Sequence, residues 1–543
     1  MIEAFAAKSG SRSLRVNGIA LHSPYDPVRE ARRFAAEGIG TEPPSTVVVL
    51  GEGLGYVADA VTELVPAARV IRVHYSAEIH LAAGPARGPA WAPGQDTDLA
   101  DFLYSHIGEL DMEGLRVLEW PPSARLFPSA SREANEAVRR VFQQLNGSLV
   151  TTIAAGRLWI RNSVENFLAF EGVLVGRPCP PDRPVIIAAP GPSLERSAGL
   201  IRDVLPRVDL WALPSSMPLL RYEGISPDLV VMTDPGHWSM HHLSFAPPEC
   251  PIAMPISAAR GTWCLSVSHG AARVPFLLSQ PGFFEEAILG AAAVTAPRIP
   301  PHGTVAATAL DLALTFTRAP VILAGLDMCA RDISFHARPN AFDTLLHLRA
   351  SRLAPHDSLM YERSSEQHAE KLPGTAGVRA SLALRTYAGW FETGGGFDAS
   401  RVYRLLPSPV ALGRMRALDG EGLRDLAART RSRSRSRGPM TATQDVYPDR
   451  EERRRIVSRL IAGWSARIQG TAKAIESAGG LDAVLGDPSC SAIAHDIEPR
   501  LLLESRRKLR RGDLAGAVET AGSMLESCGA FLRGLEKRTC VEP

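Results

Sequence analysis

The residues best suited to chemistry follow an apolar, β-branched run at Val185–Ile187. The run stops at Gly191, Pro192 and Ser193, and a helical pattern begins behind them with Ser193 as the expected N-cap. A strand, a tight turn and a helix N-terminus together present backbone N–H groups and the positive end of the helix dipole, which favours an anion such as phosphate. The glycine also lets the backbone approach a ligand closely. A βα turn without a ligand is the alternative.

Polar side chains also end three further predicted strands. They are Ser215 and Ser216 after 211–213, Asp234 after 230–233, and Asp327 after 323–325. Since ligands of parallel α/β sheets bind outside the carboxyl ends of the strands, we expect these groups and the glycine turn to surround one site. Hydroxyls and carboxylates there would hold the ribose and base of a nucleotide.

A histidine that could act as a general base follows the last of these strands. His336 lies in a loop with Arg331, Asp332 and Arg338. Imidazole suits proton transfer near neutral pH, and Asp332 could orient it. Either arginine could neutralise a carboxylate or phosphate. A structural loop histidine is the alternative. His237 and His241 could share a helix face and bind a metal, but no acidic third ligand stands near them, so no metal site is predicted.

The elements that must position these residues alternate between strand and helix patterns over residues 183–415. The strand-like runs are Pro184–Ala188, Val208–Leu213, Asp228–Thr233, Pro251–Met254, Val274–Leu278 and Pro320–Ala324. This alternation predicts an α/β fold with a doubly wound, mostly parallel central sheet and helices on both faces.

Residues 1–150 predict a second, Rossmann-like domain. An apolar strand at Thr46–Leu50 leads through the glycine loop 51–55 into a helix and a second strand at Arg69–His74. A dinucleotide site would need Asp or Glu at the end of that second strand to hold a ribose, and His74 stands there instead. We therefore expect this domain to be structural rather than to bind a cofactor.

Three further regions complete the expected organisation. Residues 151–182 predict a helical connector in which Asn162 and Asn166 share one face, where they could hold a loop or a ligand or form an interdomain surface. Residues 416–448 read as a linker with an Arg/Ser run at 429–437. Residues 449–543 have apolar residues at helical spacing and predict an α-helical C-terminal bundle for packing or assembly.

Composition limits the possible partners. The chain has 543 residues, 22% of them charged, and a formal net charge of +2, which gives no case for nucleic-acid or membrane binding. Its seven cysteines form no C-x-x-C pair, which indicates reduced thiols and a cytoplasmic protein. No run approaches the roughly 20 apolar residues that a membrane span requires, and the N-terminus lacks the apolar core of a secretory signal.

Five motifs together resemble the motility-associated-factor (Maf) proteins, whose central domain is related to 6-hydroxymethylpterin diphosphokinase (MptE-like). They are PGPSL at 190–194, GISPDLVVMTDPG at 224–236, HGTVAATALDLALTF at 302–316, PVILAGLDM at 320–328 and SFHA at 334–337. The N-terminal LHSPYDPVREA and VVVLGEGLGYVADAV also look like spirochaete-type members. The resemblance covers residues 1 to about 415.

The resemblance implies a cytoplasmic glycosyltransferase that moves a nonulosonic acid, of the pseudaminic or legionaminic type, from a CMP-sugar to Ser or Thr of flagellin or another flagellar protein. No cofactor is implied. His336 and Asp327 would be catalytic. The donor would be bound by Gly191, Pro192, Ser193, Ser215, Ser216, Asp234 and Arg338. The chain departs from the family pattern at two places. The family often has G-Q-D-L-A where this chain has Leu326 in place of the amide, and it usually has G-S-A where this chain has Pro214-Ser215-Ser216.

Two alternatives stay open. A diphosphokinase would transfer diphosphate from ATP to a pterin alcohol, with Mg²⁺ on Asp234 and Asp327 and the ATP phosphates on the glycine turn. A flagellar assembly factor would bind a nucleotide without turning it over.

Overall fold

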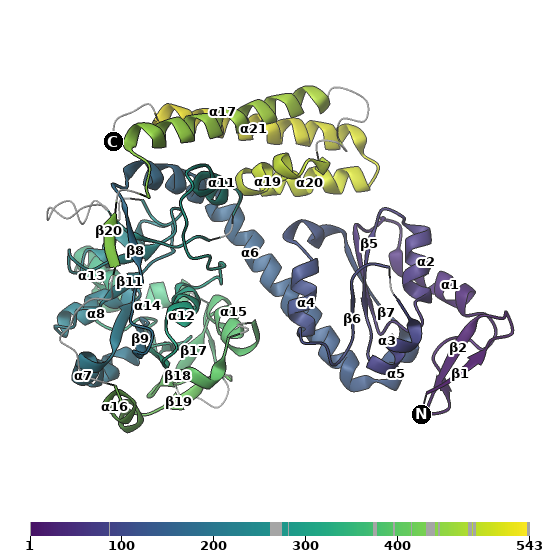
Figure 1. Ribbon diagram of the computed structural model, residues 1–543, viewed down its shortest axis with the longest axis horizontal. Coiled ribbons are helices and arrows are strands. Elements are labelled where there is room, and N and C mark those ends of the chain that lie inside the picture. Colours follow the sequence, from purple (N-terminus) through teal and green to yellow (C-terminus); the bar gives the residue numbers. More distant parts are fainter. Residues whose placement is uncertain are drawn as a thin grey trace. The chain divides into compact units, whose positions relative to one another are not determined.

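The structure is a computed structural model that describes residues 2–539, apart from 86, 261–273, 281, 367, 373–376, 395–396, 414, 431–439, 444–445, 476–480 and 482–484. The chain forms two compact units, whose elements are labelled in Figure 1. The first comprises Met1–Ala154 and Ile468–Cys528, and the second comprises Ala155–Arg467 and Gly529–Pro543. Three long helices, α6 (Pro128–Ala169), α17 (Arg450–Ile475) and α21 (Leu514–Thr539), contain the points where the chain passes between units.

The second unit is built on an eight-stranded sheet in which every neighbouring pair is parallel. The strand order is β13-β12-β11-β10-β9-β14-β18-β19. The strands are β9 (Val185–Ala188), β10 (Asp209–Ala212), β11 (Leu229–Val231), β12 (Ile252–Met254), β13 (Phe276–Leu277), β14 (Val321–Ala324), β18 (Val402–Leu405) and β19 (Arg416–Leu418). The three central strands β10, β9 and β14 are buried along their whole length, which is typical of a parallel sheet covered on both faces.

The order of the strands makes this sheet doubly wound. From β9 the chain proceeds outward to β13, and α12 (Val305–Phe316) then returns it to β14 on the other side of β9. Because crossovers between parallel strands are right-handed, the two directions of travel place their helices on opposite faces. The predicted α/β fold is confirmed, and β9 and β14 flank the point where the winding reverses.

The sheet is longer than the sequence patterns predict. The strand β19 lies beyond residue 415, the expected end of the domain, and pairs in parallel with β18. β18 and β19 each contain an arginine, Arg404 and Arg416, that interrupts the apolar run, so they gave no clear strand signal.

Helices and a small sheet surround the large sheet. The helices are α7 (Leu194–Val204), α8 (Met217–Tyr222), α9 (Trp238–Leu243), α11 (Phe283–Ala291), α13 (Ala341–Arg349), α14 (His356–Glu366), α15 (Leu382–Gly389) and α16 (Gly420–Ala428). The small antiparallel sheet contains β15 (Ala330–Arg331), β17 (Val378–Ala380) and β16 (Glu370–Lys371). Most of these elements belong to the 330–390 segment inserted between β14 and β18, which follows directly after Asp327 in the chain.

The two amides predicted to share a face of the 151–182 region hold loops of the sheet. Asn162 Nδ2 donates to Pro235 O at 3.1 Å and to a carbonyl of the 256–258 loop at 3.2 Å. Asn166 Nδ2 donates to two carbonyls of the same loop, each at 2.8 Å. Both side chains are fully buried. They therefore fix the segments that follow β11 and β12 at the carboxyl edge of the sheet.

The expected connector and linker contain regular structure of their own. Helix α6 runs without interruption through residue 150, the predicted start of the connector. Strand β8 (Val173–Gly176) then pairs antiparallel with β20 (Met440–Thr443), which lies in the predicted 416–448 linker together with α16. Residues 431–437 of the Arg/Ser run lie outside the described residues.

The first unit contains the predicted Rossmann-like sheet. Its four strands are β4 (Thr46–Leu50), β5 (Arg69–Val73), β6 (Ala90–Trp91) and β7 (Leu115–Glu119), all parallel. The spatial order β6-β5-β4-β7 places the first strand in the middle, as in a mononucleotide-binding half of a Rossmann fold. The helices of this sheet are α2 (Tyr56–Leu64), α3 (Ala77–Ala83), α4 (Leu99–His106) and α5 (Pro121–Leu126).

An N-terminal extension and C-terminal helices complete this unit. An antiparallel sheet of β1 (Ile2–Ala6), β2 (Arg12–Val16) and β3 (Ile19–Ala20) precedes α1 (Pro27–Ile39). The helices α19 (Pro488–Ile497) and α20 (Pro499–Arg510) come from the predicted C-terminal bundle. His495 of α19 binds Glu109 at 3.0 Å, so the helical region and the Rossmann-like domain are joined by a hydrogen-bonded ion pair.

The glycine loop of the Rossmann-like domain is filled by the protein's own side chains. Gly53 packs against the imidazole of His22, whose Nε2 accepts a hydrogen bond from the Leu54 N–H at 3.0 Å. Glu52 is buried in the same loop, and burial raises its pKa to about 7. The buried His74 follows β5, as the sequence predicts. These contacts agree with a structural loop.

Substitution of Gly53 by valine is expected to lower the stability of the first unit by about 2 kcal/mol or more, because a Cβ would lie 2.2 Å from His22 Nε2 and overpacking of a core typically costs 1–3 kcal/mol. The imidazole cannot move aside easily, since its ring stacks on Trp120 at 5.4 Å. The change in the urea midpoint should be compared with that of Gly147→Val, where a Cβ meets nothing within 4 Å. Equal midpoints, or tight binding of S-adenosylmethionine or NAD to this unit, would contradict a packing role for the glycine.

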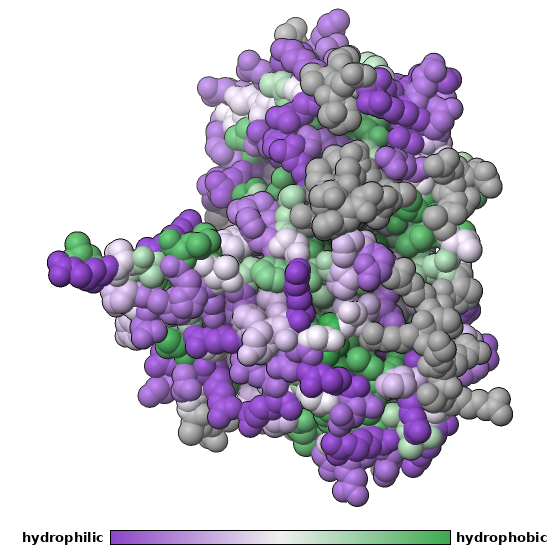
Figure 2. Space-filling model, turned by 90° about the vertical axis from the view of Figure 1, so that its left-hand side faces the viewer, coloured by the Kyte–Doolittle hydropathy of each residue, from purple (hydrophilic) through white to green (hydrophobic). Residues whose placement is uncertain are grey.

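Among the described residues, none of the helices is both long and apolar enough to span a membrane. On the face drawn in Figure 2, the described hydrophobic residues stand in separate patches among hydrophilic ones. That face therefore gives no reason to expect a broad apolar docking surface.

Candidate functional site

The loops after β9 and β14 meet at the carboxyl edge of the sheet. The ladder between these strands continues past their ends, with the Gly191 N–H donating to Gly325 O at 2.8 Å. A Cβ on Gly191 would lie 2.4 Å from that oxygen, and one on Gly325 would lie 2.2 Å from Ala189 O. The close approach that the sequence predicts for Gly191 is therefore an approach to the neighbouring loop of the protein.

Ser193 and Asp327 are joined across this junction. The Ser193 N–H donates to Asp327 Oδ2 at 2.7 Å, and the Ser193 hydroxyl donates to Asp327 Oδ1 at 2.5 Å. Both residues are almost fully buried. The carboxylate thus lies at the N-terminus of α7, where the sequence predicts an external anion. Ser193 precedes α7 as expected but forms no N-cap with its side chain, because its hydroxyl is used by Asp327.

Burial and the neighbouring polar groups act in opposite directions on the pKa of Asp327. Burial raises the pKa of the carboxyl group, and the two hydrogen bonds from Ser193 and the charge of the buried Arg404 act in the opposite direction. A carboxylate held by two donors is a rigid structural support for the turn.

A cavity of about 230 Å³ opens beside this pair. It is lined by Pro192, Ser193, Arg196, Asp327, Cys329, Arg331, Val378 and Pro409. Two exposed arginines, Arg196 of α7 and Arg331 of β15, give it a cationic wall. The cavity lies between β9 and β14, where the winding of the sheet reverses, and this is the usual place for a ligand in an open α/β sheet.

The other predicted donor-binding residues follow β10 and β11 at the same edge. Ser216 is fully buried and its hydroxyl donates to Leu213 O at 2.7 Å, while Ser215 is partly exposed. Asp234 is exposed and its Oδ1 accepts from the Gly236 N–H at 2.7 Å. Neither serine nor Asp234 lines the 230 Å³ cavity. The structure brings together Gly191, Pro192, Ser193 and Asp327. It leaves Ser215, Ser216 and Asp234 outside that group.

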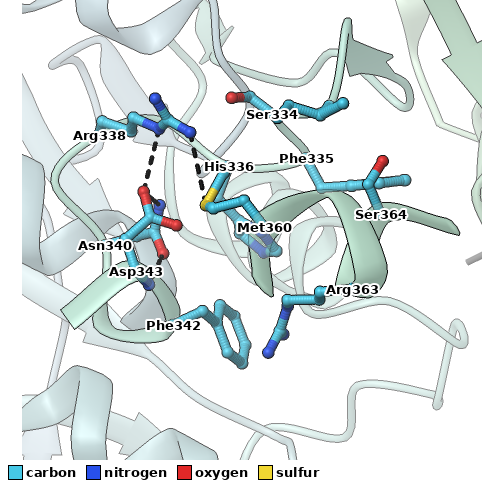
Figure 3. Close-up of a pocket in the computed structure, with 11 residues that line it drawn as sticks. Ser334, Phe335, His336, Arg338, Asn340, Phe342, Asp343, Met360, Arg363 and Ser364 are labelled. Atoms are coloured by element: carbon cyan, nitrogen blue, oxygen red, sulfur yellow. Dashed lines mark hydrogen bonds and ion pairs between the residues drawn. The ribbon is translucent and has the colours of Figure 1, made fainter. Parts of the chain in front are cut away.

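His336 and Arg338 line a second, smaller cavity of about 30 Å³, drawn in Figure 3. The guanidinium of Arg338 forms an ion pair with Asp343 at 3.0 Å, and its backbone N–H donates to Glu195 at 2.8 Å. The His336 ring packs against Phe342, with ring centroids 5.1 Å apart. About 30 Å³ has room for little more than a water molecule, so this cavity does not receive a nucleotide as it stands.

The surroundings of His336 are unfavourable for a general base. Burial, together with smaller contributions from the nearby His242 and Arg363, lowers the pKa of the imidazole to about 4. The ring is therefore neutral at pH 7, but a proton accepted there would be repelled by Arg363. Asp332, expected to orient the ring, forms no hydrogen bond with it in the described part of the chain; its backbone N–H donates to Gly377 O at 2.7 Å.

Within the described residues, no three His, Cys, Asp or Glu side chains lie together in a way that could hold a metal ion. The ring centroids of His237 and His241 lie 5.7 Å apart in an edge-to-face arrangement, as close as their predicted helical spacing suggests. Asp327 already uses both carboxylate oxygens to accept from Ser193.

Two charged residues of these cavities, Arg196 and Arg363, were missed in the sequence. Arg196 stands three residues after Ser193, so helical spacing from the turn could have identified it. Arg363 lies in the long insertion after β14 and had no local signal. Arg331, which the sequence offers as an anion-binding residue, lines the 230 Å³ cavity. Arg363 covers the Phe342 ring at 4.0 Å, a contact between two helices that periodicity does not reveal.

Comparisons with known proteins agree with this architecture. Residues 159–332 match the family described as 6-hydroxymethylpterin diphosphokinase MptE-like. An uncharacterized protein of Treponema pallidum (strain Nichols) is 26% identical over 294 residues, which cover 54% of this chain and 60% of that protein. A second one is 26% identical over 211 residues, covering 36% and 71%. The chain thus spans less than two thirds of the first relative.

A solved structure shares the fold of nearly the whole chain. The structure of MAf glycosyltransferase from Magnetospirillum magneticum AMB-1 superposes with a TM-score of 0.50 and 13% identity, covering 99% of this chain and 91% of that one. At this identity the likeness concerns the fold. The family match at 159–332 confirms that the central part of the chain resembles the MptE-like family. The superposition shows that the chain shares its fold with that glycosyltransferase.

Proposed function

We propose that the chain is a glycosyltransferase that binds an anionic, nucleotide-activated sugar at the junction of β9 and β14. The observation that carries this proposal is the 230 Å³ cavity at the reversal of the sheet, with Arg196 and Arg331 in its wall. Ligand pockets for whole small molecules are usually about 300–1,000 Å³. The cavity therefore suits the phosphate and the neighbouring sugar rather than the entire donor.

The donor phosphate would be held chiefly by arginine side chains. Two backbone N–H groups at the start of α7 are already used, since Ser193 N donates to Asp327 and Leu194 N donates to Gly191 O. Arg196 and Arg331 line the cavity without a carboxylate partner among the described ion pairs. A CMP-activated nonulosonic acid carries a phosphate and a carboxylate, and a guanidinium can bind either with two parallel hydrogen bonds.

The finer assignments follow the resemblance of the sequence to Maf proteins. We propose CMP as the nucleotide, a nonulosonic acid as the sugar, Ser or Thr of flagellin or another flagellar protein as the acceptor, and the cytoplasm as the place of reaction. Ser215 and Asp234 would contribute from the neighbouring strand ends, where their exposed positions leave them open to a bound nucleotide. Asp327 would act by holding the Ser193 turn.

The family match at 159–332 makes diphosphate transfer the second candidate. That reaction would need Mg²⁺ on Asp234 and Asp327, but the two aspartates follow β11 and β14, which are separated by β10 and β9. The geometry thus favours a phosphate held by arginine over one held by a metal.

Calorimetry with the full chain tests this proposal. We expect CMP to bind without Mg²⁺, because two guanidinium groups can neutralise a monophosphate, and we expect its affinity to fall as salt rises. ATP that binds only when Mg²⁺ is present would support the diphosphokinase instead. Absence of binding by either nucleotide would contradict both enzymes. Nucleotide binding with no turnover of a CMP-sugar or of ATP would favour an assembly factor.

A further inference from the structure

A histidine that the proposed site does not use forms a hydrogen-bonded pair with a carboxylate. His302 Nε2 lies 2.9 Å from Asp311 Oδ2, on the segment that enters α12. The His302 side chain is 15% exposed and that of Asp311 is 35% exposed, so solvent or a ligand can reach the pair. Both residues belong to the HGTVAATALD motif, to which the site described above assigns no role.

The course of α12 places this pair at the carboxyl edge of the sheet. The C-terminal end of the helix is tied to the start of β9, because Thr317 Oγ1 donates to Pro181 O and Arg183 O at 3.0 Å each. The helix packs on β9 and β14. Its 12 residues span about 18 Å, more than the length of either strand. Its N-terminus, and His302 before it, therefore lie at the edge that carries Ser193 and Asp327.

A second element links His302 to a predicted site residue. The ring of Trp390 lies 4.6 Å from that of His302. Three residues earlier, Tyr387 of α15 has a pKa raised by burial and by the charge of Asp234. One helical segment therefore approaches both His302 and Asp234, the exposed carboxylate after β11.

The hydrogen bond to Asp311 determines which ring nitrogen can accept a proton. A carboxylate accepts only, so the neutral imidazole carries its hydrogen on Nε2, and Nδ1 keeps its lone pair. Within the described residues, Nδ1 makes no hydrogen bond. An imidazolium formed by protonation of Nδ1 would be stabilised by Asp311. This is the arrangement that His336 lacks.

We propose that His302 and Asp311 form the base that activates the acceptor hydroxyl, a deduction that rests on the proposed glycosyl transfer. His302 Nδ1 takes the proton of a serine or threonine hydroxyl, whose oxygen bonds to the anomeric carbon of the sugar. The bond from that carbon to the phosphate oxygen breaks, and its electron pair leaves with the nucleotide. His302 is the catalytic residue, and Asp311 is a positioning residue.

Turnover of the full chain with a CMP-sugar donor and a hydroxyl-bearing peptide tests the pair. His302→Ala should lower kcat by about 10²–10⁴-fold with an unchanged KM for the donor, because a general base acts in the transition state. Asp311→Asn should also lower kcat, though less, with an unchanged KM for the donor, because an amide can donate to Nε2 and so leave the hydrogen on Nδ1. Asp311→Glu should restore part of the rate. His347→Ala, at an exposed histidine of α13, is the control and should leave kcat unchanged.

Thermal unfolding and CMP binding of each variant separate the possible outcomes. A folded His302→Ala protein that binds CMP and keeps full turnover overturns the proposed base and leaves the glycosyltransferase in place. Loss of turnover in His336→Ala but not in His302→Ala also overturns it. Failure of the unmodified protein to bind CMP overturns the proposed function, and the base with it. An Asp311→Asn variant with an unchanged kcat, or an Asp311→Glu variant no more active than Asp311→Asn, rejects the positioning role.

Discussion

Replacement of Gly325 by alanine is expected to destabilise the central unit by about 3 kcal/mol or more. The residue has a φ of +72°, which costs an L-residue about 1–2 kcal/mol. Its Cβ would also lie 2.2 Å from Ala189 O and 2.9 Å from Leu194 Cβ, and such overpacking adds about 1–3 kcal/mol. Neither clash can be relieved at a low cost in free energy, because one contacted atom belongs to the backbone and the other to a fully buried side chain. The urea midpoint of unfolding measures the loss.

Gly224→Ala is the matched control for this prediction. Gly224 has a φ of +67°, but a Cβ there meets nothing within 4 Å. Only the conformational cost applies, so we expect a loss of about 1 kcal/mol. A Gly325→Ala protein no less stable than the control would show that the loops after β9 and β14 are not held together by close backbone contact.

Removal of both Arg196 and Arg331 is expected to weaken CMP binding by about 100-fold. Each guanidinium is exposed, so we expect each single substitution by alanine to cost about 1–1.5 kcal/mol, near the lower end for a hydrogen bond to a charged group. That cost corresponds to roughly 5–13-fold in affinity. Isothermal titration calorimetry of the two single variants and the double variant measures it. Neither arginine pairs with a carboxylate among the described ion pairs, so the fold should be unaffected.

Arg221→Ala serves as the control of equal charge. Arg221 is an exposed residue of α8 that does not line the cavity. The Arg221→Ala variant should change the affinity for CMP little. A higher salt concentration should weaken CMP binding by the unmodified protein more than CMP binding by the double variant. Equal losses in Arg221→Ala and in the cavity variants would mean that net charge, rather than a phosphate site, explains the binding.

The local features of both sheets could be predicted because each rests on a short stretch of sequence. Apolar β-branched runs identified β9, β10, β11, β12 and β14, and the turn residues behind them marked the carboxyl ends. Parallel strands share one edge, so the same patterns also indicated where a site would form. The last two strands of the sheet, β18 and β19, were not predicted, because an arginine interrupts the apolar run of each and both lie beyond a long insertion.

The sequence by itself determined the α/β class, the order of strand and helix, and the glycine turn that precedes α7, since these depend on residues close together in the chain. Only the tertiary structure decided what occupies that turn. Asp327 reaches Ser193 across 134 positions of sequence, and no periodic pattern encodes a partner so far away. The same holds for the cationic wall: Arg196 and Arg331 face one cavity because β9 and β14 are neighbours in the sheet, and strand order is set by how the helices pack rather than by any one segment.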